Sequence, residues 1–166
     1  MGVIFITGCP GSGKSTVAAL LHEKLKCPWF EFGWIPEFRQ KNPHTEISYE
    51  EEEQISAENL LLVTDNYLRR GFSHVILTDI REPLTEAIYS HFASGQILLV
   101  TLIAENNDAI RRRVLTRNNG NEYRDAEEAV LLNETFRTRP LLPGEIRLYC
   151  DTNTPESLAE SIISQL

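Results

Sequence analysis

Apolar residues occur along the chain in short blocks that predict an alternation of strands and helices. Five runs rich in β-branched and other apolar residues have the length of buried strands, and they cover residues 3–7, 28–32, 75–77, 97–103 and 146–150. Most of the segments between these runs carry apolar residues at helical spacing. We expect one helix after residue 13, further helices over residues 48–70, 83–93, 106–117 and 125–136, and a final helix from residue 154.

Both ends of the helix expected over residues 48–70 carry strong local signals. Ser48 and Glu51 have the spacing of a capping box, and the neighbouring acidic residues suit the positive end of a helix dipole. Gly71 is placed to end the helix. Its apolar positions are expected to form one stripe, made of Ile55, residues 60–63, Tyr67 and Leu68.

Strands that alternate with helices predict a parallel sheet that is covered by helices on both faces. In sheets of this kind, ligands bind beyond the carboxyl ends of the strands. The order of the elements therefore predicts one ligand-binding rim, which gathers residues 8–15, 32–35, 79–81 and the loop after residue 103.

The stretch GCPGSGKST at residues 8–16 comes directly after the first expected strand. It fits the pattern GxxxxGK(S/T), in which glycines turn successive N–H groups inward around a polyphosphate and the following helix adds free donors. A chance glycine turn is the alternative, but the flanking strand and amphipathic helix favour phosphate binding. The expected nucleotide contacts in this loop are Gly8, Gly11, Ser12, Gly13, Lys14, Ser15 and Thr16.

Charged and hydroxyl groups near this loop are candidates for the chemistry. Lys14 has the place of the lysine that reaches the β- and γ-phosphates, and the Ser15 hydroxyl can ligate Mg²⁺. Asp79 ends an apolar strand, where phosphate-loop enzymes place an acidic group that holds Mg²⁺; a helix N-cap is its structural alternative. Arg81, two residues further on, can bind an anionic substrate group or form a surface salt bridge.

Length and charge narrow the class of protein. The chain has 166 residues, which suits a single domain, and its formal net charge of −8 disfavours a nucleic-acid or membrane-surface partner. No stretch approaches the length of a membrane span, and the cysteines, Cys9, Cys27 and Cys150, have no CxxC spacing. A reduced, cytoplasmic protein that is a monomer or homodimer is the simplest expectation.

Arginines gather in the second half of the chain, before and after a polar segment at residues 118–123. Because acidic residues are equally frequent there, an ordinary mixed-charge surface is one interpretation. The other is a lid that closes over phosphates, since Arg113 and Arg117 share one helical face next to a segment that can hinge.

The chain as a whole resembles a small P-loop kinase of the nucleoside monophosphate kinase-like superfamily. RxxxR at Arg113 and Arg117 is similar to the lid signature of adenylate- and shikimate-kinase-like enzymes, in which the first arginine packs on adenine and the second faces the phosphates. Residues 151–162 resemble the segment beside the adenine, and residues 78–82 resemble the DxR element of deoxynucleotide and phosphomevalonate kinases. The resemblance implies a three-layer α/β/α P-loop fold with a five-stranded parallel sheet of order 2-3-1-4-5. It also implies one domain over residues 1–166 with a helical lid at about residues 105–140.

The acceptor side departs from this family. Many relatives place an aspartate at the end of the second strand, whereas this chain has Gly33 and Trp34 there. Glu31 and Glu37 are the nearest carboxylates, and Glu31 either serves the acceptor or faces solvent on its strand. The residues that we expect to line the acceptor pocket are Trp34, Glu37, Arg39 and Arg81.

These features together predict an ATP- and Mg²⁺-dependent phosphotransferase with a small-molecule acceptor, for which a nucleoside or nucleotide is slightly favoured by Arg39 and Arg81. The expected catalytic residues are Lys14, Asp79, Arg113 and Arg117, with Arg113 also at the nucleotide and Ser15 and Asp79 at the metal. A nucleotide-binding ATPase or switch without an acceptor is the main alternative. A polynucleotide 5′-kinase is a weaker one, because the chain lacks a basic stripe.

Overall fold

The protein is described by a computed structural model that covers residues 2–34, 47–80, 82–92, 95–117 and 123–166. Its centre is a five-stranded sheet in which every strand pairing is parallel, with the order β2-β3-β1-β4-β5. This confirms the sheet order that the sequence predicts. The strands are β1 Gly2–Gly8, β2 Trp29–Glu31, β3 His74–Thr78, β4 Ile97–Ile103 and β5 Ile146–Tyr149.

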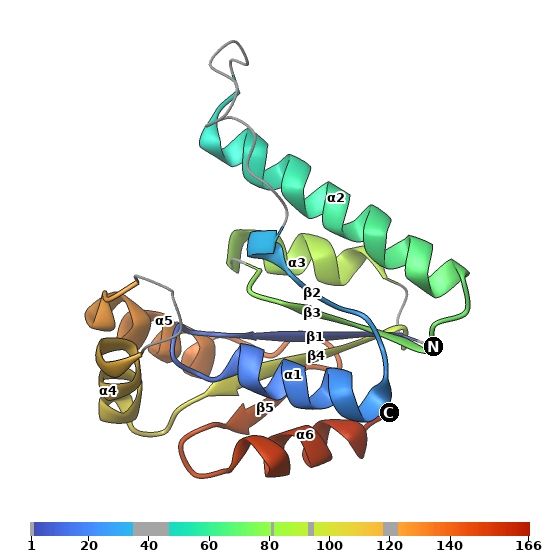
Figure 1. Cartoon of the computed structure of the whole chain (residues 1–166). Coiled ribbons are helices and arrows are strands. Elements are labelled where there is room, and N and C mark those ends of the chain that lie inside the picture. Colours follow the sequence, from blue (N-terminus) through green and yellow to red (C-terminus); the bar gives the residue numbers. More distant parts are fainter. Residues whose placement is uncertain (1, 35–46, 81, 93–94, 118–122) are drawn as a thin grey trace.

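Helices cover both faces of the sheet, so the fold is the expected three-layer arrangement. In Figure 1, α1 and α6 lie on one side of the sheet and α2 and α3 on the other, while α4 and α5 lie together at one end. A short 3-10 helix, η1 Phe32–Trp34, follows β2. The α-helices are α1 Lys14–Leu25, α2 Tyr49–Arg69, α3 Glu82–His91, α4 Asn107–Thr116, α5 Ala126–Thr138 and α6 Pro155–Ile163.

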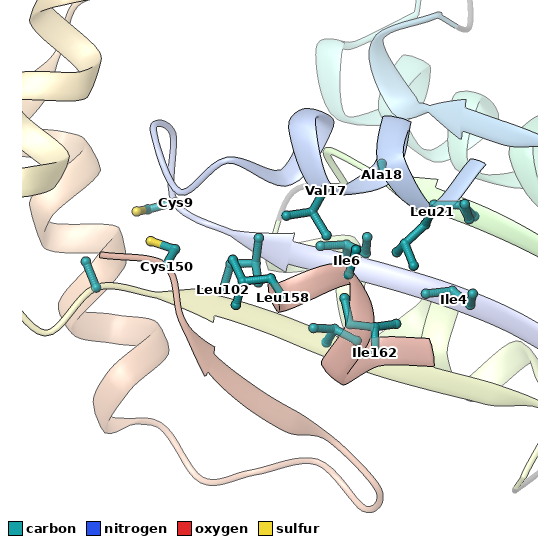
Figure 2. Packing of buried hydrophobic residues seen from close by; sticks show 14 of the residues in the cluster. Ile4, Ile6, Cys9, Val17, Ala18, Leu21, Leu102, Cys150, Leu158 and Ile162 are labelled. Atoms are coloured by element: carbon teal, nitrogen blue, oxygen red, sulfur yellow. The ribbon is translucent and has the colours of Figure 1, made fainter. Parts of the chain in front are cut away.

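The central strand β1 contributes to two separate cores because its side chains alternate between the faces of the sheet. Val3 and Phe5 pack with residues of α2 and α3, whereas Ile4 and Ile6 pack on the opposite face. Figure 2 shows this second face, where Ile4 and Ile6 lie between residues of α1 and α6. A strand that is buried on both sides reads as a continuous apolar run, which is why it was recognisable in the sequence.

The predicted capping box at the start of α2 is confirmed. Ser48 Oγ accepts from the backbone N–H of Glu51 at 3.1 Å, and Glu51 Oε2 accepts from the backbone N–H of Ser48 at 3.2 Å. The predicted apolar stripe of this helix is wrong at Leu62, whose surface is 64% exposed. Four consecutive residues cannot share one face at about 100° per residue. Leu60 is fully buried, and Leu61, Tyr67 and Leu68 pack against the core as the stripe predicts. The other buried positions of the helix are Glu52, Ser56, Ala57 and Thr64.

Among the described residues, no helix has both the length and the apolar character that crossing a membrane requires.

Candidate active site

The loop between β1 and α1 has a backbone that only glycine allows at several positions. Gly8, Gly11 and Gly13 have φ values of 140°, 84° and 93°, in the region that side chains disfavour. A Cβ atom at Gly8 would lie 2.4 Å from the carbonyl oxygen of Leu102, so the loop begins directly against β4. The glycines of the motif are therefore required by this turn as well as by any bound phosphate.

The N-terminus of α1 is left open for an anion. Its N-cap is Gly13, with no side-chain cap hydrogen bond, and its first turn carries no acidic residue. By contrast, side-chain oxygens cap the first turns of α2, α4, α5 and α6. Since uncapped N–H groups and the helix dipole both attract negative charge, α1 is prepared to bind phosphate.

Lys14 and Asp79 come together beside this loop. The Lys14 ammonium donates to the carbonyl oxygens of Gly8 at 3.0 Å and Cys9 at 3.3 Å, and lies 3.7 Å from Asp79 Oδ1. Asp79 follows β3 directly and has a positive φ of 64°, a costly conformation for a residue other than glycine. Its side chain is 57% exposed, so the carboxylate is open to the cleft as well as to the lysine.

The two arginines of the RxxxR pattern both line the same cleft. Arg113 Nη2 donates to the carbonyl oxygen of Cys150 at 2.9 Å, and Nη1 donates to that of Gly11 at 3.5 Å. Arg113 thus joins the phosphate loop to the segment after β5. Arg117 is the C-cap residue of α4, and its carbonyl oxygen accepts from Arg124 Nη2 at 3.1 Å.

The cleft that these groups line has a volume of about 1080 Å³. One part lies along the phosphate loop and α4. Another part is formed by the end of β2, by η1 and by the residues after β3, and a third by the segment before and within α6. The lining includes Glu31, Phe32, Gly33, Glu53, Asp79, Ile80, Arg113, Arg117, Tyr123, Asn153, Pro155 and Leu158.

Glu31 is the cleft carboxylate that the sequence left undecided between an acceptor role and solvent. It is the last residue of β2, lines the cleft and is only partly exposed. Its Oε1 atom is buried and has no hydrogen-bond partner within the described part of the chain. Buried polar atoms normally have partners, so this oxygen suits a donor group brought by a ligand.

The predicted acceptor residues are mostly beyond what the structure describes. Glu37, Arg39 and Arg81 lie outside the described residues, and of Trp34 only the backbone, at the end of η1, is described. Their roles therefore stay predictions. Asn153 and Pro155 line the cleft without having been predicted as contacts, although the family resemblance implies that their segment borders the adenine.

The oxygen groups near the phosphate loop fit a magnesium ion that is held together with a nucleotide. Ser15 and Asp79 both line the cleft and are exposed to it. Within the described residues, no cluster of three or more metal-ligating side chains occurs. Mg²⁺ keeps several waters and takes one or two protein oxygens besides phosphates, so this sparse set of hard oxygen ligands suits it.

Cys9 of the phosphate loop and Cys150, which follows β5, act as packing residues. Cys9 and Cys150 are buried, and Figure 2 shows their sulfur atoms at the end of the apolar core. Burial raises the pKa of the Cys9 thiol to about 12, against the opposing effect of Lys14, and burial likewise raises the pKa of Cys150. Both thiols therefore stay protonated at neutral pH and are poor nucleophiles.

The sequence of the chain matches the profile of a known protein family. A family profile described as an AAA domain matches residues 4–133, so the chain belongs to that family. No curated protein matches the sequence.

Solved structures share the fold at low sequence identity. A sugar kinase from a Janibacter species has a TM-score of 0.70 at 16% identity, covering 99% of this chain and 93% of its own. A putative kinase from Chloroflexus aurantiacus has a TM-score of 0.68 at 15% identity, with coverage of 99% and 98%. Shikimate kinase from Acinetobacter baumannii, in complex with shikimate, has a TM-score of 0.59 at 20% identity, with coverage of 99% and 92%. The predicted resemblance is confirmed, because this chain has the fold of a small P-loop kinase.

Proposed function

We propose that the protein is an ATP-dependent kinase that transfers the γ-phosphoryl group to a hydroxyl group of a small molecule. One observation carries this proposal: Lys14, Asp79 and Glu31 line a single cleft, which opens beside the uncapped N-terminus of α1. A phosphate loop with a lysine binds the donor, and a carboxylate across the cleft serves the acceptor. The fold shared with sugar, shikimate and other kinases supports this assignment.

Each residue of the cleft is assigned a role according to its position. The N–H groups at the start of α1 and the Lys14 ammonium hold the β- and γ-phosphates, and Arg113 and Arg117 neutralise charge on the side of α4. Ser15 and Asp79 hold Mg²⁺, which supplies charge neutralisation at the phosphate oxygens when it is bound. Lys14, which in this structure bonds to loop carbonyl oxygens, turns its ammonium toward the nucleotide.

Glu31 serves the acceptor. The acceptor oxygen forms a bond to the γ-phosphorus as the bond to the β–γ bridging oxygen breaks, and ADP leaves. The carboxylate of Glu31 orients the attacking hydroxyl group and takes its proton. Phosphoryl transfer depends mainly on positioning and charge neutralisation, so one carboxylate within the cleft is sufficient.

We propose further that the acceptor carries an anionic group. Trp34, Glu37, Arg39 and Arg81 follow β2 or β3 in the chain and are proposed to complete its pocket. Two arginines in this group favour an acceptor that carries an anionic group, such as a nucleotide, over an uncharged nucleoside. One structure with this fold, shikimate kinase from Acinetobacter baumannii, is a complex of that protein with shikimate.

A panel of acceptors tests the function directly. ATP and Mg²⁺ are incubated with the protein and with nucleosides, nucleotides, sugars and hydroxy acids, and acceptor-dependent release of ADP is measured. Release with one acceptor class, together with a phosphorylated product, supports the kinase. ADP release that no acceptor stimulates supports instead a nucleotide-binding ATPase or switch.

The setting of the reaction follows from the cysteines. All three, Cys9, Cys27 and Cys150, are free and buried, which fits a reducing compartment. We place the kinase in the cytoplasm, as a monomer or homodimer without a nucleic-acid or membrane partner.

A further inference from the structure

Asn133 is a polar residue on the buried face of α5. Its surface is 0% exposed, and it shares this face with Ala126, Ala129 and Phe136. A buried amide without hydrogen-bond partners destabilises the fold, and asparagine is also a poor helix former. An asparagine at this position is therefore stable only because of its partners.

All four hydrogen-bonding positions of the Asn133 amide are occupied. Its Oδ1 accepts from the backbone N–H of Ala104 at 2.9 Å and faces the Cys9 thiol at 3.9 Å. Its Nδ2 donates to the carbonyl oxygen of Ala104 at 2.9 Å and to Asn107 Oδ1 at 2.9 Å. One side chain thus connects α5 with the turn between β4 and α4, with the start of α4, and with the phosphate loop.

Ala104 explains why an amide is needed here. It is fully buried and comes directly after the last residue of β4, where pairing with β5 has ended. Its N–H and C=O groups would otherwise be buried without partners, and Asn133 satisfies both in the way a neighbouring strand would. The amide thereby fixes the path of the chain from β4 into α4.

The phosphate loop packs against this same unit. A Cβ atom at Gly11 would lie 3.1 Å from Val114 Cγ2 and 3.5 Å from the carbonyl oxygen of Ile110, so the tip of the loop touches α4. Arg113 of α4 donates to the Gly11 carbonyl oxygen at 3.5 Å. A shift of α4 would consequently move the wall that supports the loop.

We propose that Asn133 is a positioning residue for nucleotide binding, which holds the β4–α4 turn and α5 in the place that the phosphate loop requires. This inference rests on the proposed function only in that the loop binds a nucleotide. Asn133 does not line the cleft, so it acts through Ala104, Asn107 and Cys9. Replacement should weaken nucleotide binding beyond the effect of lost stability.

The test measures the Kd for ADP by titration calorimetry, at a temperature where thermal unfolding shows each variant to be folded. Asn133→Leu removes all four contacts, and Asn133→Asp keeps an acceptor for Ala104 N–H and Cys9. Asn107→Ala removes one contact from the opposite side, together with the bond that Asn107 Nδ2 donates to Glu134 Oε1 at 2.7 Å. The matched control is Ile88→Val, which removes one buried methylene group of α3, in the core on the face of the sheet opposite the one that contains Cys9 and Ala129. It lowers stability without touching the loop or α4.

The expected result is a rise of roughly tenfold in Kd for Asn133→Leu and smaller rises for Asn133→Asp and Asn107→Ala, a size typical of coupling through packed contacts. Ile88→Val should stay within about twofold of the wild type, because the site is distant from the loop. An unchanged Kd in the Asn133 variants, or an equal rise in Ile88→Val, overturns the positioning role. If neither Asn133 variant folds, an unchanged Kd in Asn107→Ala overturns it. A wild type without affinity for ADP overturns the proposed function itself.

Discussion

Two carboxylates with buried oxygen atoms, Glu145 and Glu31, lie in different parts of the sheet, and they use their hydrogen-bonding capacity in opposite ways. Around Glu145, just before β5, the carboxylate is fully buried and accepts from Arg139 through two bonds of 2.7 and 2.8 Å, from Thr101, and from the backbone N–H of Leu142 at 2.9 Å. At the carboxyl end of the sheet, Glu31 Oε1 and Ser12 Oγ are buried without partners among the described residues, and α1 has no side-chain cap.

The difference separates a structural cluster from a binding site. Every oxygen of Glu145 is used inside the protein, so no ligand can gain from it. The cleft, in contrast, keeps donors and acceptors available and holds Asp79 in a costly backbone conformation. We expect changes at Glu145 to affect stability and changes in the cleft to affect activity.

The largest effect is expected for Glu145→Ala. It leaves Arg139 largely buried without its carboxylate, which should cost about 3–5 kcal/mol of unfolding free energy, measured by urea denaturation. The control is Glu127→Ala, which breaks the more exposed two-bond pair with Arg111 and should change the free energy of unfolding little. Equal losses in both variants would contradict the structural role of the Glu145 cluster.

Lys14→Ala should have the next largest effect, on activity. Removal of the ammonium should lower turnover by about 10² or more, because a preorganised charge contact to the phosphates is lost. Lys24→Ala, on the same helix but paired at the surface with Glu160 at 2.8 Å, is the control and should retain full turnover. Unchanged phosphorylation of the acceptor in Lys14→Ala would rule out the kinase assignment.

Glu31→Gln should lower kcat on the order of tenfold, the lower range for a group that moves a proton. The amide keeps the size of the side chain but cannot take the proton. Glu53→Gln is the matched variant, since Glu53 lines the same cleft but already accepts from the Tyr49 hydroxyl at 2.9 Å. A larger loss of kcat in Glu53→Gln than in Glu31→Gln would show that Glu53, and not Glu31, serves the acceptor.

The smallest effect concerns pH. Burial opposes ionisation of Glu145, but hydrogen bonds from Arg139, Thr101 and Leu142 outweigh it, and the pKa of Glu145 lies below its ordinary value of 4.5. Its ionised form therefore contributes stability above that value, and this contribution is lost as the pH falls through the lowered pKa. Urea midpoints of the wild type should decline on acidification below about pH 4.5, and Glu145→Gln should flatten the decline. An unchanged slope in Glu145→Gln would assign the acid sensitivity to other carboxylates.

The parts of this protein that the sequence predicted are those with local causes. The capping box at Ser48 and Glu51 depends on neighbours three residues apart, and the glycine loop from Gly8 depends on its own backbone. The buried strands were recognisable because parallel sheets are apolar on both faces. These signals gave the fold, the sheet order through a family resemblance, and the donor half of the candidate site.

Only the tertiary structure decided the contacts between residues that lie far apart in the sequence. Helical spacing placed Arg113 on one face with Arg117, but not its bonds to Gly11 and Cys150, which depend on where β1 and β5 lie beside β4. The same holds for Glu31, whose carboxylate lines the cleft because β2 ends beside β3. Asn133 is the clearest case, because nothing in its own helix indicates a role for an asparagine. Its role follows from Ala104, 29 positions away, whose backbone N–H and C=O groups both bond to the Asn133 amide.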